Sequence, residues 1–157
     1  MVVESLSYSF ARGDLFTYMD FRHKIRVSLA GRAAEEVALG FDWISSGSKA
    51  DLENCFKLAS RAFADWSFAP NMNDAETSAS NLAVILGNAS HSELLHNETL
   101  VRNFLTVEYK ATVKILNENR TLLDAIADRL MRDSVLDQGE IAELYAAYVG
   151  QSNAVQI

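Results

Sequence analysis

The histidines are the first residues in this sequence whose chemistry could serve an enzyme. There are three of them, His23, His91 and His96. Two histidines four residues apart on a helix can hold one zinc ion, while a glutamate between them activates the bound water. No two of these histidines have that spacing, and the gap between His91 and His96 turns them about 140° apart on a helix. The chain therefore contains no HExxH motif, and we expect surface or capping roles for its histidines.

Two sets of acidic residues also have spacings that suggest chemistry. Glu35 and Glu36 are adjacent carboxylates, which could perform acid–base catalysis, although adjacent acids on a helix more often form a solvated or salt-bridged face. We expect no catalytic residue in the chain. Ser48 and Asp51 have the spacing of a capping box before an apolar stripe, and acidic side chains are favoured in the first turn of a helix. The residues alone thus favour a capping role for Asp51.

The single cysteine, Cys55, excludes an internal disulfide and a cysteine-rich zinc site. A reducing compartment is the simpler expectation. Cys55 shares an apolar helical stripe with Leu52 and Ala59. We interpret it as a small core residue, with a reactive thiol as the alternative.

The composition is typical of one folded domain. The chain has 157 residues, of which 49% are hydrophobic, and this is enough apolar material for a core. The formal net charge of −7 disfavours nucleic acid and an anionic membrane surface as partners, because both need clustered Lys and Arg. No apolar run approaches the roughly 20 residues of a membrane helix, and Met1 to Phe16 does not resemble a signal peptide. We expect the chain itself to be soluble and to make no membrane contact.

A polar stretch around the only proline, Pro70, divides the chain into two helical parts. Before it, an apolar stripe predicts a helix over roughly Asp20 to Leu39, which Gly40 would end in a left-handed conformation. A second stripe runs from Leu52 to Trp66 and predicts that this tryptophan is in the core. Gly31 inside the first helix costs about 1 kcal/mol relative to alanine, so we expect it to permit close approach of another helix.

Three further stripes predict helices in the C-terminal half. They run from Phe104 to Ile115, from Leu122 to Leu130 and from Ile141 to Tyr148. We expect the first two of these helices to form a hairpin. The last helix should begin at a capping box formed by Asp137 and Glu140.

Signals of β-structure are few. Alternating residues from Ser5 to Tyr18 could form a small hairpin. The expected fold is therefore mainly α, a helical bundle with at most a small N-terminal β-hairpin. We expect a single domain over residues 1–157, in which 1–68 form the part around Asp51, 69–96 a polar segment, and 97–150 the C-terminal helical hairpin and last helix.

Three blocks of sequence carry a resemblance to a known family. The first is LAGRAAEEV over residues 29–37, the second is SGSKADLE over 46–53, and the third is the long tail from Glu98 to Ile141. In order and spacing they resemble the C-terminal peptidase domain of the FtsH family of membrane-anchored, ATP-dependent zinc metalloproteases, whose corresponding segments read LGGRAAEE and S-x-G-A-x-N-D-L-E. The resemblance extends from Leu6 to about Leu144.

The resemblance implies that this chain is the C-terminal part of a proteolytic domain, in which Asp51 is the third zinc ligand and the helices form the scaffold of a ring. In the family an HExxH helix supplies the other two ligands and the general base. Because this motif is missing here, we expect the isolated chain to be inactive and to bind neither zinc nor ATP. Both would belong to the parent protein, with ATP on an upstream domain.

The resemblance further implies that the parent is a hexameric homo-oligomer that degrades protein substrates on the cytoplasmic side of a membrane. The sequence departs from the family at Ala50, where the family has Asn, and over residues 67–88, which lack the family's L-G-P strand. The alternative reading is a non-catalytic, degenerate helical interaction or oligomerisation module. Upstream HExxH and nucleotide-loop motifs would distinguish the two.

Overall fold

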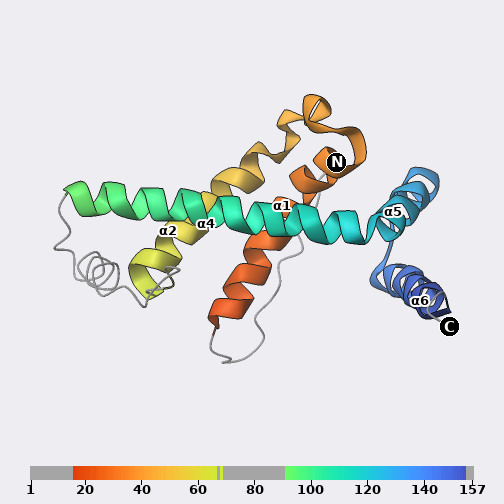
Figure 1. Cartoon of the computed structure of the whole chain (residues 1–157). Coiled ribbons are helices and arrows are strands. Elements are labelled where there is room, and N and C mark those ends of the chain that lie inside the picture. The colour runs from red at the N-terminus through yellow and green to blue at the C-terminus, as the bar shows by residue number, and fades with distance from the viewer. Residues whose placement is uncertain (1–15, 67, 69–90, 155–157) are drawn as a thin grey trace.

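The computed structural model describes residues 16–66, 68 and 91–154, and every regular element in this part of the chain is helical (Figure 1). The helices are α1 (Tyr18–Leu39), α2 (Lys49–Trp66), α4 (His91–Glu118), α5 (Arg120–Asp133) and α6 (Gln138–Ala154), with the short 3-10 turns η1 (Phe41–Trp43) and η2 (Ser46–Ser48) between α1 and α2. The prediction of a mainly α fold is confirmed. The hairpin expected over residues 5–18 lies almost wholly outside the described residues, as does the polar stretch around Pro70.

Local sequence explains both ends of α1. The Thr17 hydroxyl accepts a hydrogen bond from the Asp20 N–H (3.2 Å), and the Asp20 carboxylate accepts one from the Thr17 N–H (3.0 Å), which together form a capping box. The helix therefore starts at Tyr18, slightly before the expected Asp20. It ends before Gly40, whose φ of 89° is accessible at little cost to a residue without a Cβ. The ψ of Gly40 is 162°, so this residue does not adopt the left-handed helical conformation that we expected.

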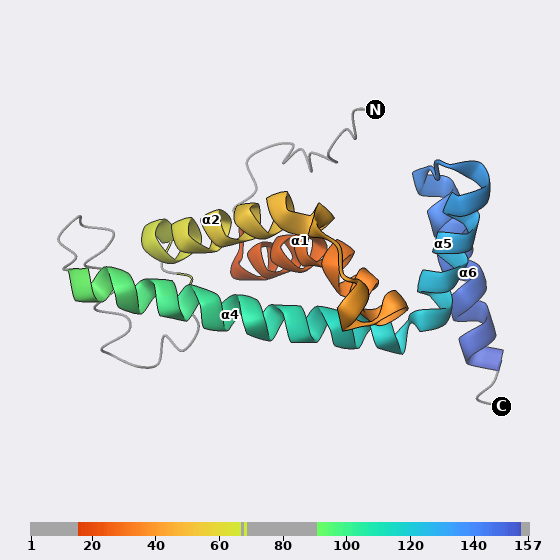
Figure 2. The same ribbon diagram turned by 90° about the horizontal axis from the view of Figure 1, so that it is seen from above.

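The core lies where α1, α2 and α4 meet. Figure 1 shows the long α4 crossing α1 and α2, and Figure 2 shows these two helices on the same side of it. Phe21 of α1 stacks on Phe104 of α4 with ring centroids 5.2 Å apart, and Phe63 of α2 meets Phe104 edge-on at 5.4 Å. Burying one such side chain stabilises the fold by roughly 1.5–3 kcal/mol. The other buried apolar residues are Ile25, Leu29, Ala33, Cys55, Ala59, Ala62 and Val101.

α5 and α6 pack against each other beyond the end of α4 (Figure 2), whereas we expected α4 and α5 to form the hairpin. The inner face of α4 is occupied by α1 and α2, and the helix breaks at Asn119, where φ is −113° and ψ is 29°. Arg120 donates a hydrogen bond to the carbonyl of Val37, which attaches the start of α5 to the last turn of α1. The predicted capping box is present at α6, because Asp137 and Glu140 exchange two hydrogen bonds of 2.9 Å.

Two packing expectations are not met among the described residues. Gly31 is exposed, and a Cβ added there would meet no described atom within 4 Å, so no described helix approaches it closely. Trp66 is 39% exposed and lies at the edge of the core, where its ring contacts Phe16 and Phe68 with centroids 5.4 and 5.7 Å away. A helical stripe predicts the direction of a side chain, but not how far the neighbouring helix extends to cover it.

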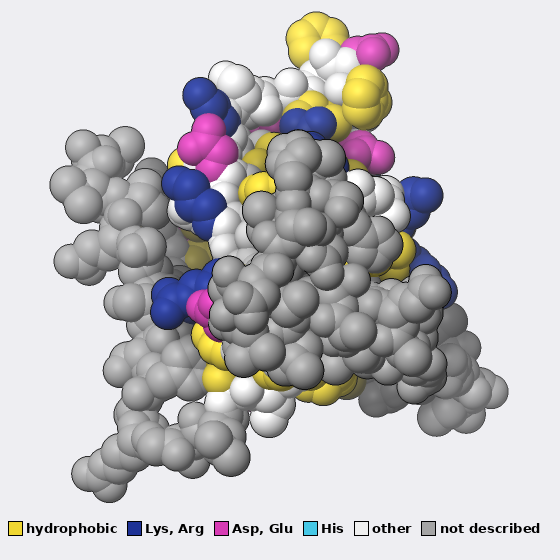
Figure 3. Space-filling model, turned by 90° about the vertical axis from the view of Figure 1, so that its left-hand side faces the viewer, with side chains coloured by type: hydrophobic (Ala, Val, Ile, Leu, Met, Phe, Trp, Pro, Cys, Tyr) yellow, Lys and Arg dark blue, Asp and Glu magenta, His cyan; other side chains and the backbone are white. Residues whose placement is uncertain are grey.

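Several exposed charges on the described surface pair within single helices, whereas Arg129 of α5 and Glu140 of α6 pair between helices at 3.3 Å. Arg61 and Asp65 of α2 lie 3.1 Å apart, and Arg102 and Glu98 of α4 lie 2.6 Å apart. Figure 3 shows acidic and basic side chains beside one another on the described part of one face. Pairs of this kind contribute about 0.3–0.5 kcal/mol each. Among the described helices, none combines the length and apolar character that crossing a bilayer requires.

Candidate functional site

Asp51 lies in the first turn of α2, and its side chain is exposed. Its carboxylate forms no hydrogen bond or ion pair with another residue in the described part of the chain. The capping box expected from Ser48 is not formed, because the Ser48 hydroxyl is buried without a described hydrogen-bond partner. The turn η2 leads directly into α2 instead. Asp51 thus occupies a position where the helix dipole favours a carboxylate, but it has no described local role.

The connection that leads to Asp51 is held by Glu35 of α1. The Glu35 carboxylate accepts hydrogen bonds from the Ser45 backbone N–H (2.8 Å) and from the Ser45 hydroxyl (2.7 Å). The Ser45 hydroxyl oxygen in turn accepts a hydrogen bond from the Gly47 N–H (3.1 Å), which caps η2. The side-chain and backbone hydrogen bonds from Ser45 lower the pKa of Glu35 below its ordinary value. Glu35 therefore connects α1 to the turn that precedes α2.

The adjacent acid, Glu36, has a different partner. Its carboxylate accepts a hydrogen bond of 2.5 Å from the hydroxyl of Tyr109 on α4. Burial, followed by this hydrogen bond, raises the pKa of Tyr109 to about 12. The two adjacent carboxylates thus serve two different contacts, one to the connection after α1 and one to α4. The two acids therefore bind different partners on different segments.

The other candidate metal ligands do not gather around Asp51. No group of three or more His, Cys, Asp or Glu side chains within residues 16–66, 68 and 97–150 could hold a metal ion. Cys55 lies one turn further along α2 but is 1% exposed, and its thiol faces the carbonyl of Ile25 at 3.8 Å. Burial raises the pKa of this thiol to about 11, and the charge of Asp51 adds to the effect. The interpretation of Cys55 as a core residue is confirmed.

The structure describes the side chain of one of the three histidines, His23. His23 is exposed on α1, as expected for a surface residue. The side chains of His91 and His96, in the first turns of α4, lie outside the described side chains. Asp51, the metal ligand predicted from the sequence, belongs to no group of three or more potential metal ligands among the described side chains.

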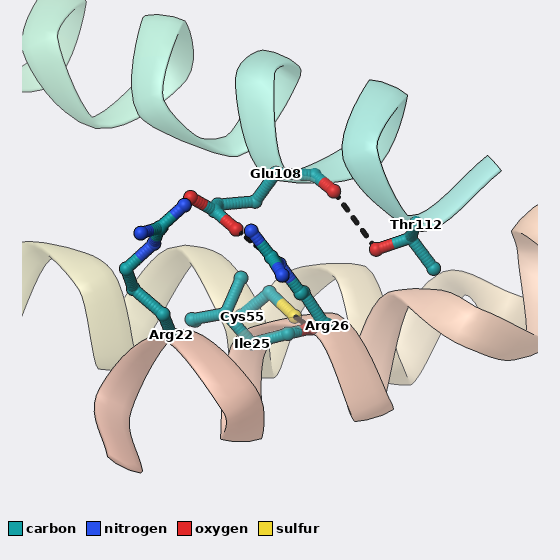
Figure 4. Close-up of polar contacts among 6 residues, drawn as sticks. All are labelled: Arg22, Ile25, Arg26, Cys55, Glu108 and Thr112. Atoms are coloured by element: carbon teal, nitrogen blue, oxygen red, sulfur yellow. Dashed lines mark hydrogen bonds and ion pairs between the residues drawn. The ribbon is translucent and has the colours of Figure 1, made fainter. Parts of the chain in front are cut away.

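A buried ion-pair cluster was not predicted from the sequence. Glu108 of α4 is 2% exposed and accepts hydrogen bonds from Nε of Arg22 (2.8 Å) and Nε of Arg26 (2.5 Å), both on α1 (Figure 4). Thr112 donates to the Glu108 backbone carbonyl at 2.8 Å, one turn along α4. In the sequence, the sign of this cluster is a pair of arginines four residues apart beside the apolar stripe of α1. Their acidic partner is more than 80 residues away in the sequence, so that signal could not identify it.

Comparison with known proteins places this geometry in context. The sequence pattern of peptidase family M41 matches residues 11–144 of the chain. Over 137 residues the chain is 32% identical to an ATP-dependent zinc metalloprotease FtsH from Opitutus terrae, a match that covers 86% of this chain and 22% of that protein. Proteins of the same name from Mesomycoplasma conjunctivae and Trieres chinensis are 28% and 30% identical, over 92% and 80% of this chain and 19% and 20% of their own lengths. The chain thus spans about a fifth of the length of these curated relatives.

Proposed function

The chain belongs to peptidase family M41, and we propose from this premise that it forms the C-terminal part of the proteolytic domain of an FtsH-like, ATP-dependent zinc metalloendopeptidase. In this proposal Asp51 is the third zinc ligand, and α1, α2 and α4 form the scaffold that holds it. The two histidine ligands and the general base would come from an HExxH helix in the rest of a longer polypeptide. The chain matches only about a fifth of the length of each relative, which is consistent with ligands that lie elsewhere in a longer polypeptide.

The state of the Asp51 carboxylate is the observation that carries this proposal. It is exposed at the start of a helix whose inner face is buried in the core, and no other described residue binds it. A carboxylate oxygen is one of the usual ligands of zinc. The competing capping role keeps only the favourable helix dipole, because the Ser48 hydroxyl does not take part in a capping box. Asp51 could therefore serve as one zinc ligand. The described residues do not supply the full set of ligands that a zinc site needs.

The chemistry would be divided between this chain and its parent. Bound zinc lowers the pKa of a coordinated water to about 7 and polarises a peptide carbonyl. This chain contributes one fixed carboxylate and the helices behind it, and one carboxylate alone binds zinc weakly. We therefore propose that the isolated chain holds no zinc and hydrolyses no peptide.

The proposal extends to the partners of the parent protein. Its relatives are named ATP-dependent, so ATP would bind to a domain outside this chain. The substrates would be proteins, and the parent would be a ring of six identical subunits on the cytoplasmic side of a membrane, as the resemblance to the FtsH family implies. The helices described here would supply part of the ring's scaffold.

A non-catalytic role as a helical interaction or oligomerisation module is the second candidate. Ala50 favours it, because the family has Asn at this position and the replacement removes a possible hydrogen-bonding neighbour of the metal ligand. The incomplete set of metal ligands among the described residues is also compatible with it. This candidate predicts that the parent reading frame contains neither HExxH nor a Gly-x-x-x-x-Gly-Lys-Ser/Thr nucleotide loop.

The decisive experiment compares zinc content and proteolysis in the longer polypeptide and its Asp51→Ala variant. We expect one zinc per subunit and ATP-dependent degradation of an unfolded protein in the wild type, and loss of both in the variant. Glu53→Ala is the matched control, because Glu53 is also exposed near the start of α2 and pairs only with Lys49 among the described residues. Equal zinc content in the wild type and in Asp51→Ala would contradict the proposed ligand. Tight stoichiometric zinc in the isolated chain would contradict its predicted inactivity.

A further inference from the structure

The segment between α1 and α2 precedes Asp51 in the chain, and a described side chain of α1 forms hydrogen bonds to this segment. Residues 40–48 form two short 3-10 turns with no buried apolar side chain. Glu35 of α1 binds this segment through both carboxylate oxygens, one to the Ser45 N–H and one to the Ser45 hydroxyl. The Ser45 hydroxyl then caps η2, which ends where α2 begins. A continuous series of hydrogen bonds thus runs from α1 to the helix turn that contains Asp51.

We propose that Glu35 is a positioning residue for Asp51, and that it acts by fixing the Ser45–Ser48 turn from which α2 starts. The inference rests on the proposed role of Asp51 as a zinc ligand. Because no described side chain forms a hydrogen bond or ion pair with the exposed Asp51 carboxylate, its location depends mainly on the backbone at the start of α2. A metal ligand must be held to within about 0.5 Å of its working position, which requires a supporting shell of this kind.

Glu35 is well placed to act as such a support. It lies on the part of α1 that follows the buried residues Leu29 and Ala33, so its own backbone is fixed by the core. Its carboxylate is matched to the turn, because each oxygen accepts one hydrogen bond from the same serine. Glu36, the next residue, binds Tyr109 on α4 instead and does not contact the turn. Glu36 is therefore a matched control for Glu35. The two residues have the same charge and are adjacent on α1, but they bind different partners.

The first test uses the isolated chain and measures amide hydrogen exchange. In an α-helix the N–H groups of Glu53 and Asn54 bond to the carbonyls of residues 49 and 50, so their exchange reports the first turn of α2. We expect Glu35→Ala to accelerate exchange at Gly47 and at these two amides by about tenfold, while Glu36→Ala changes them less than about twofold. Glu35→Gln should be intermediate, because an amide side chain keeps one acceptor oxygen. Equal exchange in the two alanine variants would overturn the proposal.

The second test measures zinc affinity in the longer polypeptide by competition with a chelator. Removing a residue that orients a metal ligand typically costs 10–100-fold in affinity, so we expect Glu35→Ala to weaken zinc binding by about that factor. Ser45→Ala should weaken it in the same direction and provides a second variant if Glu35→Ala folds poorly. Glu36→Ala should leave the affinity within about twofold. Unchanged affinity in both Glu35→Ala and Ser45→Ala would overturn the positioning role.

The two tests separate this inference from the proposed function. If the wild-type longer polypeptide binds no zinc, or if Asp51→Ala binds it equally well, the ligand role fails, and the positioning role toward zinc fails with it. If Asp51→Ala loses zinc while the Glu35 variants retain it, the proposed function stands and only the positioning role is overturned. Faster exchange at the start of α2 together with weaker zinc binding supports both.

Discussion

Nε of Arg26 on α1 lies 2.5 Å from Oε2 of Glu108 on α4, in an ion pair whose acid is buried and whose base is partly exposed. Arg22 binds the other carboxylate oxygen at 2.8 Å, and the two arginine side chains are 25–31% exposed against 2% for the glutamate side chain. The acid therefore depends on the arginines for its hydrogen bonds, whereas the arginines can also reach water. This asymmetry decides which substitutions should be costly.

Removing both arginines should destabilise the protein more than removing the acid. Arg22→Met combined with Arg26→Met keeps apolar side-chain stems but leaves a buried carboxylate without partners, which should lower the free energy of unfolding by about 3–5 kcal/mol. Glu108→Leu should cost less, because the freed guanidinium groups can turn to water. Urea unfolding followed by circular dichroism measures both values. A larger loss for Glu108→Leu than for the double variant would contradict this reading of the cluster.

Cys55 should react slowly with thiol reagents while the protein is folded. Its pKa is raised to about 11 by burial, and the thiolate is the reactive form, so little of it exists at pH 8. We expect labelling by a chromogenic disulfide reagent at pH 8 to be limited by opening of the α1–α2 contact. Full labelling within seconds in concentrated urea is the control. Comparable speed in the folded protein would show that the thiol is accessible.

The contact between Glu35 and Ser45 should weaken in acid. The pKa of Glu35 is lowered in the folded protein by its hydrogen bonds from Ser45, so its contribution to stability is present above the ordinary value of 4.5 and is lost as the pH falls through the lower, folded pKa. We expect the NMR signals of Ser45 and Gly47 to shift together as the pH falls below about 4.5. In Glu35→Gln the same signals should not titrate in this window. A profile identical to that of the wild type would assign the shift to another group.

Tyr109 should be among the last tyrosines to ionise in alkali. Its folded pKa of about 12 exceeds the ordinary value of 10.0, so the stability it contributes is complete below pH 10 and is lost as the pH rises through about 12. Ultraviolet absorbance of phenolate, compared between the wild type and Tyr109→Phe, should show that the variant lacks a component titrating near pH 12. Loss of a component near pH 10 instead would show that burial and Glu36 do not act on this group.

The capping box of α6 should control local rather than global stability. Asp137→Ala removes the acceptor for the Glu140 N–H and should cost about 1 kcal/mol. No described side chain of α5 or α6 is fully buried, so the cost should appear as faster amide exchange in α6 rather than as unfolding of the α1–α2–α4 core. Asp128→Ala, an exposed change on α5 outside the box, is the control. A matching rise in exchange within α2 would indicate that the whole protein unfolds as one unit.

Several elements of the fold follow from residues close together in the sequence. The buried stripe of α1 and its end at Gly40 were both predicted, because helical periodicity and the conformational freedom of glycine act within one turn. The Asp137–Glu140 box was predicted for the same reason. The Ser48–Asp51 box has an equally good spacing but did not form, because η2 leads into α2 and buries the Ser48 hydroxyl. Spacing permits a cap, and the path of the chain decides whether it forms.

The sequence by itself determined the helical class, the inward faces of α1 and α2 and, through the blocks over residues 29–37 and 46–53, the family. Only the tertiary structure decided that Glu35 binds Ser45, that Glu36 binds Tyr109, and that α5 packs on α6 rather than along α4. The physical reason is the range of the forces concerned. Periodicity and capping are settled among neighbours three or four positions apart, whereas a carboxylate finds its donor only after the packing of the core has brought distant segments within hydrogen-bonding distance.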